Sequence, residues 1–202
     1  MLTRLKKRVQ EALVSEALFL HRIGFTANAI SLIGFLLALS SSTIYAARFL
    51  SFTRMFAAAV LLLASGFCDA LDGVVARTCG QASIFGGFLD SLLDRYADAF
   101  VFSGIIVGGL CNIYVGLGAL AGSLLVSYAR ARAEAAGVKT ETIGVAERAE
   151  RIIILAASSL AAVAWMPALN LGVLLLAFLA NLTVLQRGIH VYKSLKGKKE
   201  QV

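Results

Sequence analysis

The chain of 202 residues has little of what builds a soluble domain. Only 15% of its residues are charged, and it contains one proline and two histidines. Apolar residues make up 59%, and the mean hydropathy of +0.82 lies far above that of soluble proteins. No polar stretch is long enough for a second domain, and no repeat is visible. The composition therefore excludes a soluble globular protein and predicts a single membrane domain over residues 1–202.

Cysteine is scarce and follows no metal or redox pattern. Cys68, Cys79 and Cys111 are odd in number, and they show neither CxxC spacing nor histidines at metal-ligand intervals. We interpret them as small apolar residues that pack between helices.

The chain does contain a series of long apolar runs. Runs of about 20 residues can each cross a hydrocarbon core of roughly 30 Å as a helix. We therefore expect an all-α integral membrane protein with six transmembrane helices, which form a bundle over residues 27–190. The first run is longer than the core of a signal peptide and others follow it, so we expect it to be retained. The expected spans are 27–47, 54–76, 84–110, 113–135, 147–165 and 168–190.

The segment before the first span, residues 1–25, has a different pattern. Apolar residues recur there at helical intervals with basic residues between the early ones, which is typical of an amphipathic helix at a membrane surface. The sequence thus predicts a juxtamembrane helix ahead of the bundle. The apolar positions are Leu5, Val9, Ala12, Leu13, Ala17 and Leu20.

Basic residues are distributed unevenly between the two ends of the expected spans. Of the 19 lysines and arginines, only Arg48 and Arg54 fall in a loop on the side opposite the termini. By the positive-inside rule, both termini should lie in the cytoplasm, including a basic tail at residues 191–202. The net charge of +7 then reflects this topology and attraction to anionic membrane lipids. It gives no support to nucleic-acid binding.

Four aspartates interrupt the apolar pattern at regular intervals. Asp69 and Asp72 lie near the cytoplasmic end of the second span, and Asp90 and Asp94 lie near the start of the third. Spacings of three and four place each pair on one helix face, and the short turn between the spans brings both pairs to the same depth. Such a cluster would take up protons in a low dielectric unless cations are present. Hard oxygen ligands suit Mg²⁺, Mn²⁺ or Ca²⁺.

Small residues and one arginine surround the aspartates. Small residues leave the backbone open to a ligand, and Arg77 can bind phosphate oxygens beside the cluster. These small residues are Gly73, Ala76, Gly80, Gly86 and Gly87. Two metal ions held there could clamp a diphosphate and stabilise the charge on its leaving group. The alternatives for the same residues are a polar helix interface or an ion pathway.

The ordered set resembles the signature of the CDP-alcohol phosphotransferase family. Written out, it reads Asp69-x2-Asp72-Gly73-x2-Ala76-Arg77-x8-Gly86-x3-Asp90-x3-Asp94. Eight fixed residues over 26 positions make a specific motif, and the family's six-helix membrane architecture covers nearly the whole chain. The resemblance implies transfer of a phosphatidyl-type group from a CDP-linked lipid to an alcohol, with release of CMP.

The resemblance also implies roles for individual residues. The four aspartates would hold a pair of Mg²⁺ or Mn²⁺ ions, and Asp94 would also act as general base on the acceptor hydroxyl. "TANAIS", at the start of the first span, is similar to the family's entry motif, with Ala27 in place of its proline. Asp98 lies outside the signature and is expected to support the cluster by a hydrogen bond or an ion pair. For Ser83 the alternative is a helix N-cap. The residues implied for the CDP-lipid site are Asn28, Asp69, Gly73, Ala76, Arg77, Gly80, Ser83 and Gly86.

The arginines that follow the signature bear on the acceptor. Several arginines facing one cavity would suit an acceptor that carries its own phosphate; the alternative is ordinary positive-inside charge, which we favour for Lys139. "RARAEAAG", "ERAERIIIL" and "TVLQR" are similar to segments of the phosphatidylinositol-phosphate and archaetidylinositol-phosphate synthases, with Ala149 where many relatives have proline. By that resemblance the acceptor is inositol phosphate. The candidate residues for its phosphate are Arg130, Arg132, Arg148, Arg151 and Arg187.

Other functions stay open on the sequence alone. The same chemistry could use glycerol 3-phosphate or another alcohol, and the donor could be CDP-diacylglycerol or CDP-archaeol. A cation transporter would use the aspartates as a transit site, and a catalytically silent scaffold would use them for packing. The family further implies a homodimer, although helix faces toward lipid and toward a partner look alike in sequence.

Overall fold

The computed structural model describes residues 12–47, 51–140 and 143–199, and its regular secondary structure in these ranges is entirely helical. The first element is a short helix, and six longer ones follow it. In chain order they are α2 (Val14–Arg22), α3 (Ala27–Ala46), α4 (Phe52–Thr78), α5 (Ile84–Val107), α6 (Ile113–Ala135), α7 (Arg148–Ala162) and α8 (Pro167–Lys199).

Helices α3 to α8 coincide with the six expected spans, in the same order along the chain. By length and apolar composition, four of the described helices can cross a membrane, namely α3, α4, α6 and residues Pro167–Lys196 of α8. The 24-residue helix α5 is long enough, but charged residues interrupt its apolar pattern, and α7 has only 15 residues. The all-helical membrane architecture is thus confirmed, and helix length and composition identify four spans directly.

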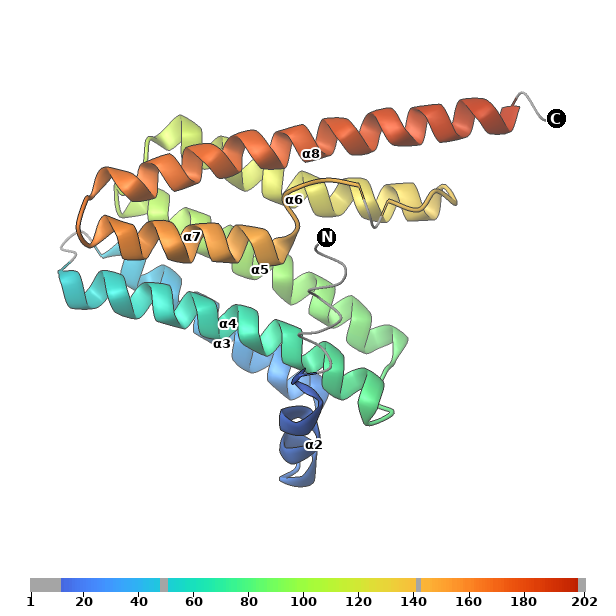
Figure 1. Ribbon diagram of the computed structural model, residues 1–202, viewed down its shortest axis with the longest axis horizontal. Helices are drawn as coiled ribbons and strands as arrows, with labels where there is room; N and C mark the ends of the chain where they lie inside the picture. The colour runs from blue at the N-terminus through green and yellow to red at the C-terminus, as the bar shows by residue number, and fades with distance from the viewer. Residues whose placement is uncertain (1–11, 48–50, 141–142, 200–202) are drawn as a thin grey trace.

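The last helix is longer than expected. Helix α8 continues past residue 190 to Lys199, so the basic tail expected at 191–202 is helical as far as it is described. The segment contains no proline and several lysines, which are good helix formers, so nothing in it ends the helix abruptly. At about 1.5 Å per residue, α8 is roughly 50 Å long. Its end extends beyond the other helices (Figure 1).

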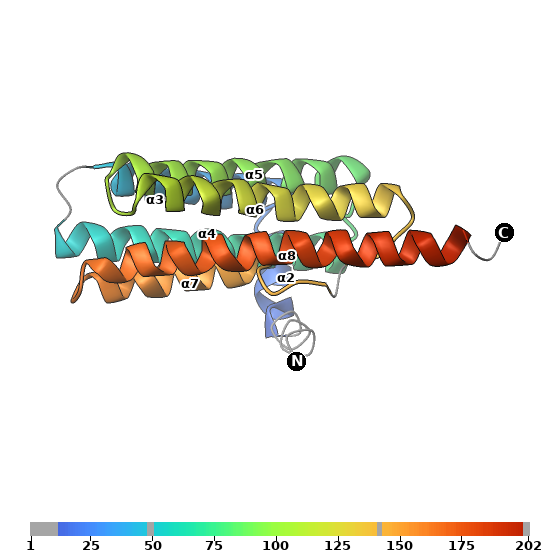
Figure 2. The same ribbon diagram turned by 90° about the horizontal axis from the view of Figure 1, so that it is seen from above.

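The six long helices form a closed ring. Helix α3 packs against α4 and α5, α4 against α7, α7 against α8, α8 against α6, and α6 against α5. Two perpendicular views show them running side by side along one direction (Figure 1, Figure 2). The largest apolar cluster between them includes the buried Tyr45 and Phe102. Large side chains such as Phe56 and Phe178 are exposed on the outside, as expected for helix faces that lipid tails cover.

Helix α2 lies across the direction of the ring and packs against α4 (Figure 1). Its Ala17 is fully buried in an apolar cluster with Leu71 and Val75 of α4, while Phe19 is exposed. An amphipathic helix ahead of the first span is therefore present. Residues 1–11, which form the first part of the expected segment, lie outside the described ranges.

Four of the helices begin at a side chain that caps them. The oxygen of a Ser, Thr or Asn accepts a hydrogen bond from a backbone N–H in the first turn, which satisfies a donor that the helix leaves free. The capping residues are Thr26 for α3, Ser51 for α4, Ser83 for α5 and Asn112 for α6. Ser83 thereby fixes the start of α5, and with it the position of the aspartates on that helix.

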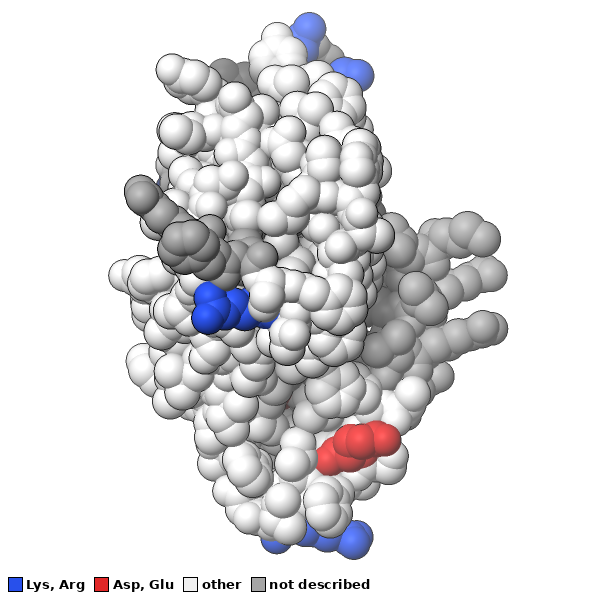
Figure 3. All heavy atoms as spheres, turned by 90° about the vertical axis from the view of Figure 1, so that its left-hand side faces the viewer, with Lys and Arg blue, Asp and Glu red and all other residues white. Residues whose placement is uncertain are grey.

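Among the described residues, one end of the ring carries few charged side chains. The connections α3–α4, α5–α6 and α7–α8 lie at this end, and its surface shows few coloured atoms (Figure 3). The α5–α6 connection is instead fastened by polar uncharged groups, since the backbone N–H of Asn112 donates to Oδ1 of Asn170 at 2.9 Å. Basic residues such as Arg77, Arg132 and Lys193 belong to the opposite ends of α4, α6 and α8.

Candidate active site

Three of the four signature aspartates lie close together. Asp69 and Asp72 on α4 and Asp90 on α5 each offer a carboxylate oxygen, and the three oxygens lie within 4.8 Å of one another. Hard oxygen ligands at this spacing fit a divalent cation such as Mg²⁺ or Mn²⁺. The turn between the two helices contains Gly80, whose φ of 68° lets the chain reverse sharply.

Asp94 lies beside this cluster and is joined to it by an arginine. Nη1 of Arg148, at the start of α7, lies 2.6 Å from Oδ1 of Asp94 and 2.8 Å from Oδ1 of Asp69. Nη1 and Nε of Arg148 are both buried, yet neither makes an aligned hydrogen bond within the described part of the chain. Arg148 is thus held among the carboxylates chiefly by charge.

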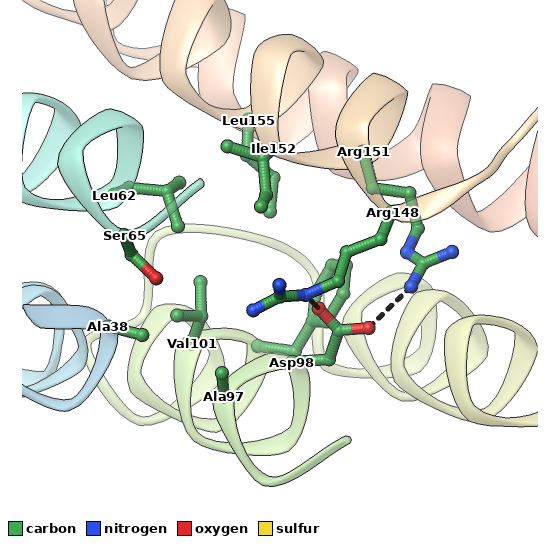
Figure 4. A pocket seen from close by; sticks show the side chains of 11 residues that line it. Ala38, Leu62, Ser65, Ala97, Asp98, Val101, Arg148, Arg151, Ile152 and Leu155 are labelled. Carbon is green, nitrogen blue, oxygen red and sulfur yellow. Dashed lines mark hydrogen bonds and ion pairs between the residues drawn. The ribbon is translucent and has the colours of Figure 1, made fainter. Parts of the chain in front are cut away.

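Asp98 continues the acidic face of α5 one turn further and contacts two arginines. Its Oδ2 accepts a hydrogen bond from Nη2 of Arg151 at 2.5 Å, and its Oδ1 lies 3.8 Å from Nε of Arg148 (Figure 4). Arg151 also donates from Nη1 to the carbonyl oxygen of Ala146 at 2.8 Å. The supporting ion pair expected of Asp98 is therefore present, and it joins α5 to α7.

An internal cavity lies next to these charges, between α3, α4, α5 and α7. Arg148 and Asp98 line its polar side, and apolar residues such as Ile152 line the rest (Figure 4). Ser65 of α4 is fully buried there, and its hydroxyl has no hydrogen-bond partner among the described residues. The sequence pattern did not single out Ser65, although it precedes Asp69 by one turn on the same helix face.

Ser31 on α3 is a second residue of the site that sequence reasoning missed. Its hydroxyl donates a hydrogen bond of 2.6 Å to Oδ2 of Asp72, which is itself buried. A signal was present, because Ser31 is the last residue of "TANAIS" and lies on α3 with Asn28. The hydrogen bond fixes the orientation of one carboxylate of the cluster.

Residues expected for the CDP-lipid site gather around the α4–α5 turn. A Cβ atom added at Gly86 would lie 3.0 Å from Oδ1 of Asn28 and 2.9 Å from Oγ of Ser83. In the same way, a Cβ atom at Gly73 would lie 3.2 Å from Nη1 of Arg77. The two glycines therefore leave just enough room for the polar groups beside them. Of the remaining expected positions, Ala76 is half-buried and Gly80 is exposed.

The turn itself is fastened by hydrogen bonds. Oε1 of Gln81 accepts from the backbone N–H of Ala27 at 2.8 Å, and Nε2 of Gln81 lies 3.0 Å from Nδ1 of His21. A proline at position 27 would have no N–H to donate. Ala27, which replaces the proline of the family's motif in "TANAIS", therefore allows the hydrogen bond to Gln81. Ser83 caps α5 by accepting from the N–H of Gly86 at 2.9 Å, as the alternative reading of this residue predicted.

Two of the candidate acceptor arginines are bound to the backbone. Arg187 on α8 is 2% exposed, and it donates from Nε to the carbonyl oxygen of Ile143 at 2.9 Å and from Nη1 to that of Val126 at 2.6 Å. Arg151, also 2% exposed, holds Ala146 in the same manner. Both arginines therefore tie the connection between α6 and α7 to neighbouring helices.

The other three candidate arginines have different surroundings. Nε of Arg130 lies 2.8 Å from a carboxylate oxygen of Glu134 one turn further along α6, and Arg132 is exposed. Arg148 contacts the aspartates of the signature directly. The five candidate arginines therefore differ in their contacts. Arg151 and Arg187 bind backbone carbonyls, and Arg130 pairs with Glu134. Arg132 is exposed, and Arg148 contacts the signature aspartates.

Asp69, Asp94 and Asp98 meet Arg148 and Arg151 between the apolar helices, and ionisable groups at such a position mark a functional site. The model of the CDP-alcohol phosphatidyltransferase family matches residues 25–187, and the chain belongs to this family.

Individual relatives are similar over most of their length. The chain is 46% identical over 176 residues to the archaetidylinositol phosphate synthase of Methanothermobacter thermautotrophicus, covering 87% of each chain. It is 40% identical over 196 residues to the protein of the same name from Pyrococcus horikoshii, covering 97% of this chain and 99% of that one.

Solved structures of a third relative have the same fold. They are crystal structures of the phosphatidylinositol phosphate synthase of Mycobacterium tuberculosis, which is 30% identical to this chain. The structure with CDP-DAG bound gives a TM-score of 0.76 and covers 89% of this chain and 93% of that chain. The structure in complex with manganese and citrate gives a TM-score of 0.77 and covers 89% and 88%.

Proposed function

We propose that the chain transfers a phosphatidyl or archaetidyl group from a CDP-lipid to inositol phosphate and releases CMP. The observation that carries the proposal is the position of Arg148, a cation of α7 that lies against the aspartates of α4 and α5. An acceptor phosphate bound near this guanidinium would bring the acceptor hydroxyl within reach of Asp94. The two archaeal relatives, both named archaetidylinositol phosphate synthase, support the same acceptor.

The reaction would take place at the donor phosphorus that carries the lipid. Asp94 would accept the proton of the acceptor hydroxyl, whose oxygen forms the new bond to this phosphorus. The bond from phosphorus to the bridging oxygen breaks, and CMP leaves with that oxygen and the bonding electron pair. Arg77, exposed beside Gly73, would bind the oxygens of the diphosphate.

The proposed metal ligands are the four signature aspartates, which would hold two Mg²⁺ or Mn²⁺ ions. The close approach of oxygens from Asp69, Asp72 and Asp90 supports this, as does the manganese complex of the mycobacterial relative. Such ions, when bound, neutralise the diphosphate and stabilise the charge on the leaving CMP. Ser31 would keep Asp72 oriented for this role.

For the CDP-lipid we propose a site at the α4–α5 turn, beside the start of α3. The support is the open space that the glycines leave next to polar groups and the CDP-DAG bound in the mycobacterial relative. The lipid tails would extend outward between helices into the membrane. The proposed residues are Asn28, Asp69, Gly73, Ala76, Arg77, Gly80, Ser83 and Gly86.

For the acceptor phosphate we propose Arg148 as the direct contact, with Arg130, Arg132, Arg151 and Arg187 as the surrounding positive charge. A phosphate with two negative charges bound at Arg148 would gain from the positive charge of the arginines around it. An uncharged acceptor such as free inositol would not.

We also propose that all six helices of the ring cross the membrane and form one domain with the juxtamembrane segment 1–25 and the tail 191–202. Helices α5 and α7 lie alongside the four apolar spans in the ring, and their charged residues meet one another inside it. The almost uncharged surface at the opposite end supports termini and an active site on the cytoplasmic side (Figure 3). A homodimer, which the resemblance to the family implies, is also part of this proposal.

An acceptor competition assay tests the proposed function. Purified protein is incubated with CDP-diacylglycerol or CDP-archaeol, with Mg²⁺ or Mn²⁺, and with inositol phosphate, glycerol 3-phosphate or inositol. CMP release and the lipid product are measured, and the Asp94→Asn variant serves as the inactive control. We expect product with inositol phosphate and none with the other two acceptors.

Other outcomes of this assay would overturn the proposal. Product with glycerol 3-phosphate alone would move the protein to a different acceptor within the same chemistry. Metal flux into liposomes without a CDP-lipid, together with no CMP release from the intact protein, would identify a cation transporter. A protein that responds in neither assay would be a scaffold.

A further inference from the structure

Arg148 is held differently from the other buried arginines near it. Arg151 and Arg187 each donate aligned hydrogen bonds to backbone carbonyl oxygens, so a fixed part of the fold keeps them in place. Arg148 has close contacts with two carboxylates, but its buried Nη1 and Nε make no aligned hydrogen bond within the described residues. Its position therefore depends on the charge of Asp69 and Asp94.

The same two carboxylates belong to the proposed metal site. A divalent cation bound by Asp69 and Asp94 would lie within a few ångströms of the Arg148 guanidinium, because both would contact the same carboxylates. Like charges at such a distance in a low dielectric repel strongly. Arg148 contacts Oδ1 of both carboxylates, so metal ions that take these oxygens displace the arginine.

We infer that Arg148 is an exchangeable counter-ion of the site. In the metal-free protein its guanidinium neutralises Asp69 and Asp94, and it leaves both carboxylates when divalent cations bind. The released guanidinium then becomes available to the phosphate of the acceptor. The exchange rests on the proposed metal site, and this last step rests also on the proposed acceptor.

Asp98 can remain an ion-pair partner of the displaced Arg148. Its Oδ1 already lies 3.8 Å from Nε of Arg148, and Arg151 holds its Oδ2. A guanidinium that loses Asp69 and Asp94 can therefore turn about Asp98 without losing all its negative partners. Asp98 acts here as a positioning residue, outside the metal site.

The exchange makes metal binding and acceptor binding dependent on each other. Metal binding must displace Arg148, so the arginine weakens metal binding in the absence of acceptor. Once it is displaced, the arginine raises the affinity for phosphate, and by linkage the phosphate raises the affinity for metal by the same factor. Typical couplings of this kind change affinity by about five- to 150-fold.

A titration with Mn²⁺ alone tests the exchange. Purified wild-type protein, Arg148→Gln and Arg148→Lys are titrated without donor or acceptor, and free Mn²⁺ is measured by electron paramagnetic resonance. We expect Arg148→Gln to bind Mn²⁺ about tenfold more tightly than the wild type, and Arg148→Lys, which keeps the charge, to stay close to the wild type. Lys193→Gln removes the same charge from an exposed position of α8, outside the proposed sites, and should leave the affinity unchanged.

A second measurement does not depend on the folding of a variant. The affinity of wild-type protein for inositol phosphate is determined by calorimetry with and without Mn²⁺, and we expect Mn²⁺ to tighten it about fivefold or more. In Arg148→Gln and in Asp98→Asn this effect of Mn²⁺ should shrink, because the arginine is absent in one variant and poorly placed in the other.

Several results would overturn the inference. Equal or weaker Mn²⁺ binding by a folded Arg148→Gln would mean that the arginine organises the metal site instead of competing for it. The coupling between metal and acceptor would be rejected if Mn²⁺ did not change the affinity of the wild type for inositol phosphate. It would also be rejected if the effect of Mn²⁺ persisted in Arg148→Gln. Absence of product with inositol phosphate, alongside the expected Mn²⁺ titration, would reject the proposed acceptor and leave the counter-ion exchange intact.

Discussion

The two halves of the site are built in different ways. Apart from Asn28 on α3, the donor half is one continuous stretch, residues 69–94, that forms the end of α4, a turn and the start of α5. The acceptor half consists of Arg130, Arg132, Arg148, Arg151 and Arg187, which come from α6, α7 and α8. The first half is assembled by local helix geometry, and the second half is assembled only by the closing of the ring.

This difference decides how the residues behave. In the donor half, residues of one type share one environment, since three aspartates place their oxygens together. In the acceptor half, residues of one type separate, and Arg187 binds carbonyl oxygens while Arg148 binds carboxylates. The role of each arginine in the acceptor half therefore has to be tested with its own substitution.

The largest expected effect lies in the donor half. Asp94→Asn keeps the size of the side chain but removes the charge and the ability to accept a proton, so turnover should fall by about a thousandfold or more. The rate of CMP release measures it. Glu16→Gln on α2, the same chemical change at an exposed position, should keep wild-type activity. An equal loss of CMP release in both variants would contradict a specific role of Asp94 in catalysis.

The next effect separates the arginines within the acceptor half. Arg187→Ala removes the hydrogen bonds from Arg187 to the carbonyl oxygens of Ile143 and Val126, which should lower the free energy of unfolding by about 3 kcal/mol. Thermal unfolding in detergent measures the loss. Arg132→Ala, at an exposed position, should unfold at the wild-type temperature. A variant of Arg187 as stable as wild type would mean that these hydrogen bonds contribute little.

A smaller effect distinguishes two adjacent glycines of the donor half. An added methyl group at Gly86 would lie within 3.0 Å of polar atoms of Asn28 and Ser83, so Gly86→Ala should raise the KM for the CDP-lipid about tenfold. The KM for the acceptor should not change. At Gly87 no atom lies within 4 Å of such a methyl group, and Gly87→Ala is the matched control. Similar donor KM values for both variants would contradict the proposed CDP-lipid site.

The smallest effect concerns a residue that supports the cluster from outside. Ser31→Ala removes the hydrogen bond to Asp72, and the concentration of Mg²⁺ needed for half-maximal activity should rise about fivefold. Ser40 on the same helix donates only to the carbonyl oxygen of Leu36, on an exposed face, as far as the described contacts show. Ser40→Ala should therefore leave the Mg²⁺ requirement unchanged, and a shift in both variants would point to α3 as a whole.

The donor half could be predicted from the sequence because its geometry is local. Spacings of three and four place Asp69 with Asp72 and Asp90 with Asp94 on their helix faces, and a turn of a few residues brings the two helices together. The helix bundle could also be predicted from the sequence. The long apolar runs give the order of α3 to α8 and nearly all of their boundaries.

The acceptor half could be predicted as a set but not as individual contacts. Arg148 and Arg151 are three residues apart on α7, yet one contacts the signature aspartates and the other binds Asp98 and the carbonyl of Ala146. This difference depends on where α5 lies relative to α7. The spacing of residues along α7 does not predict that position. The hydrogen bond of Ser31 to Asp72 was hidden for the same reason, because it crosses from α3 to α4.

The hydrogen bond between Gln81 and the N–H of Ala27 fastens the turn of the donor half to the start of α3. Proline, which the family's entry motif has at this position, has no N–H to donate. An Ala27→Pro substitution would therefore remove this bond and leave the side chain of Gln81 with its contact to His21 alone.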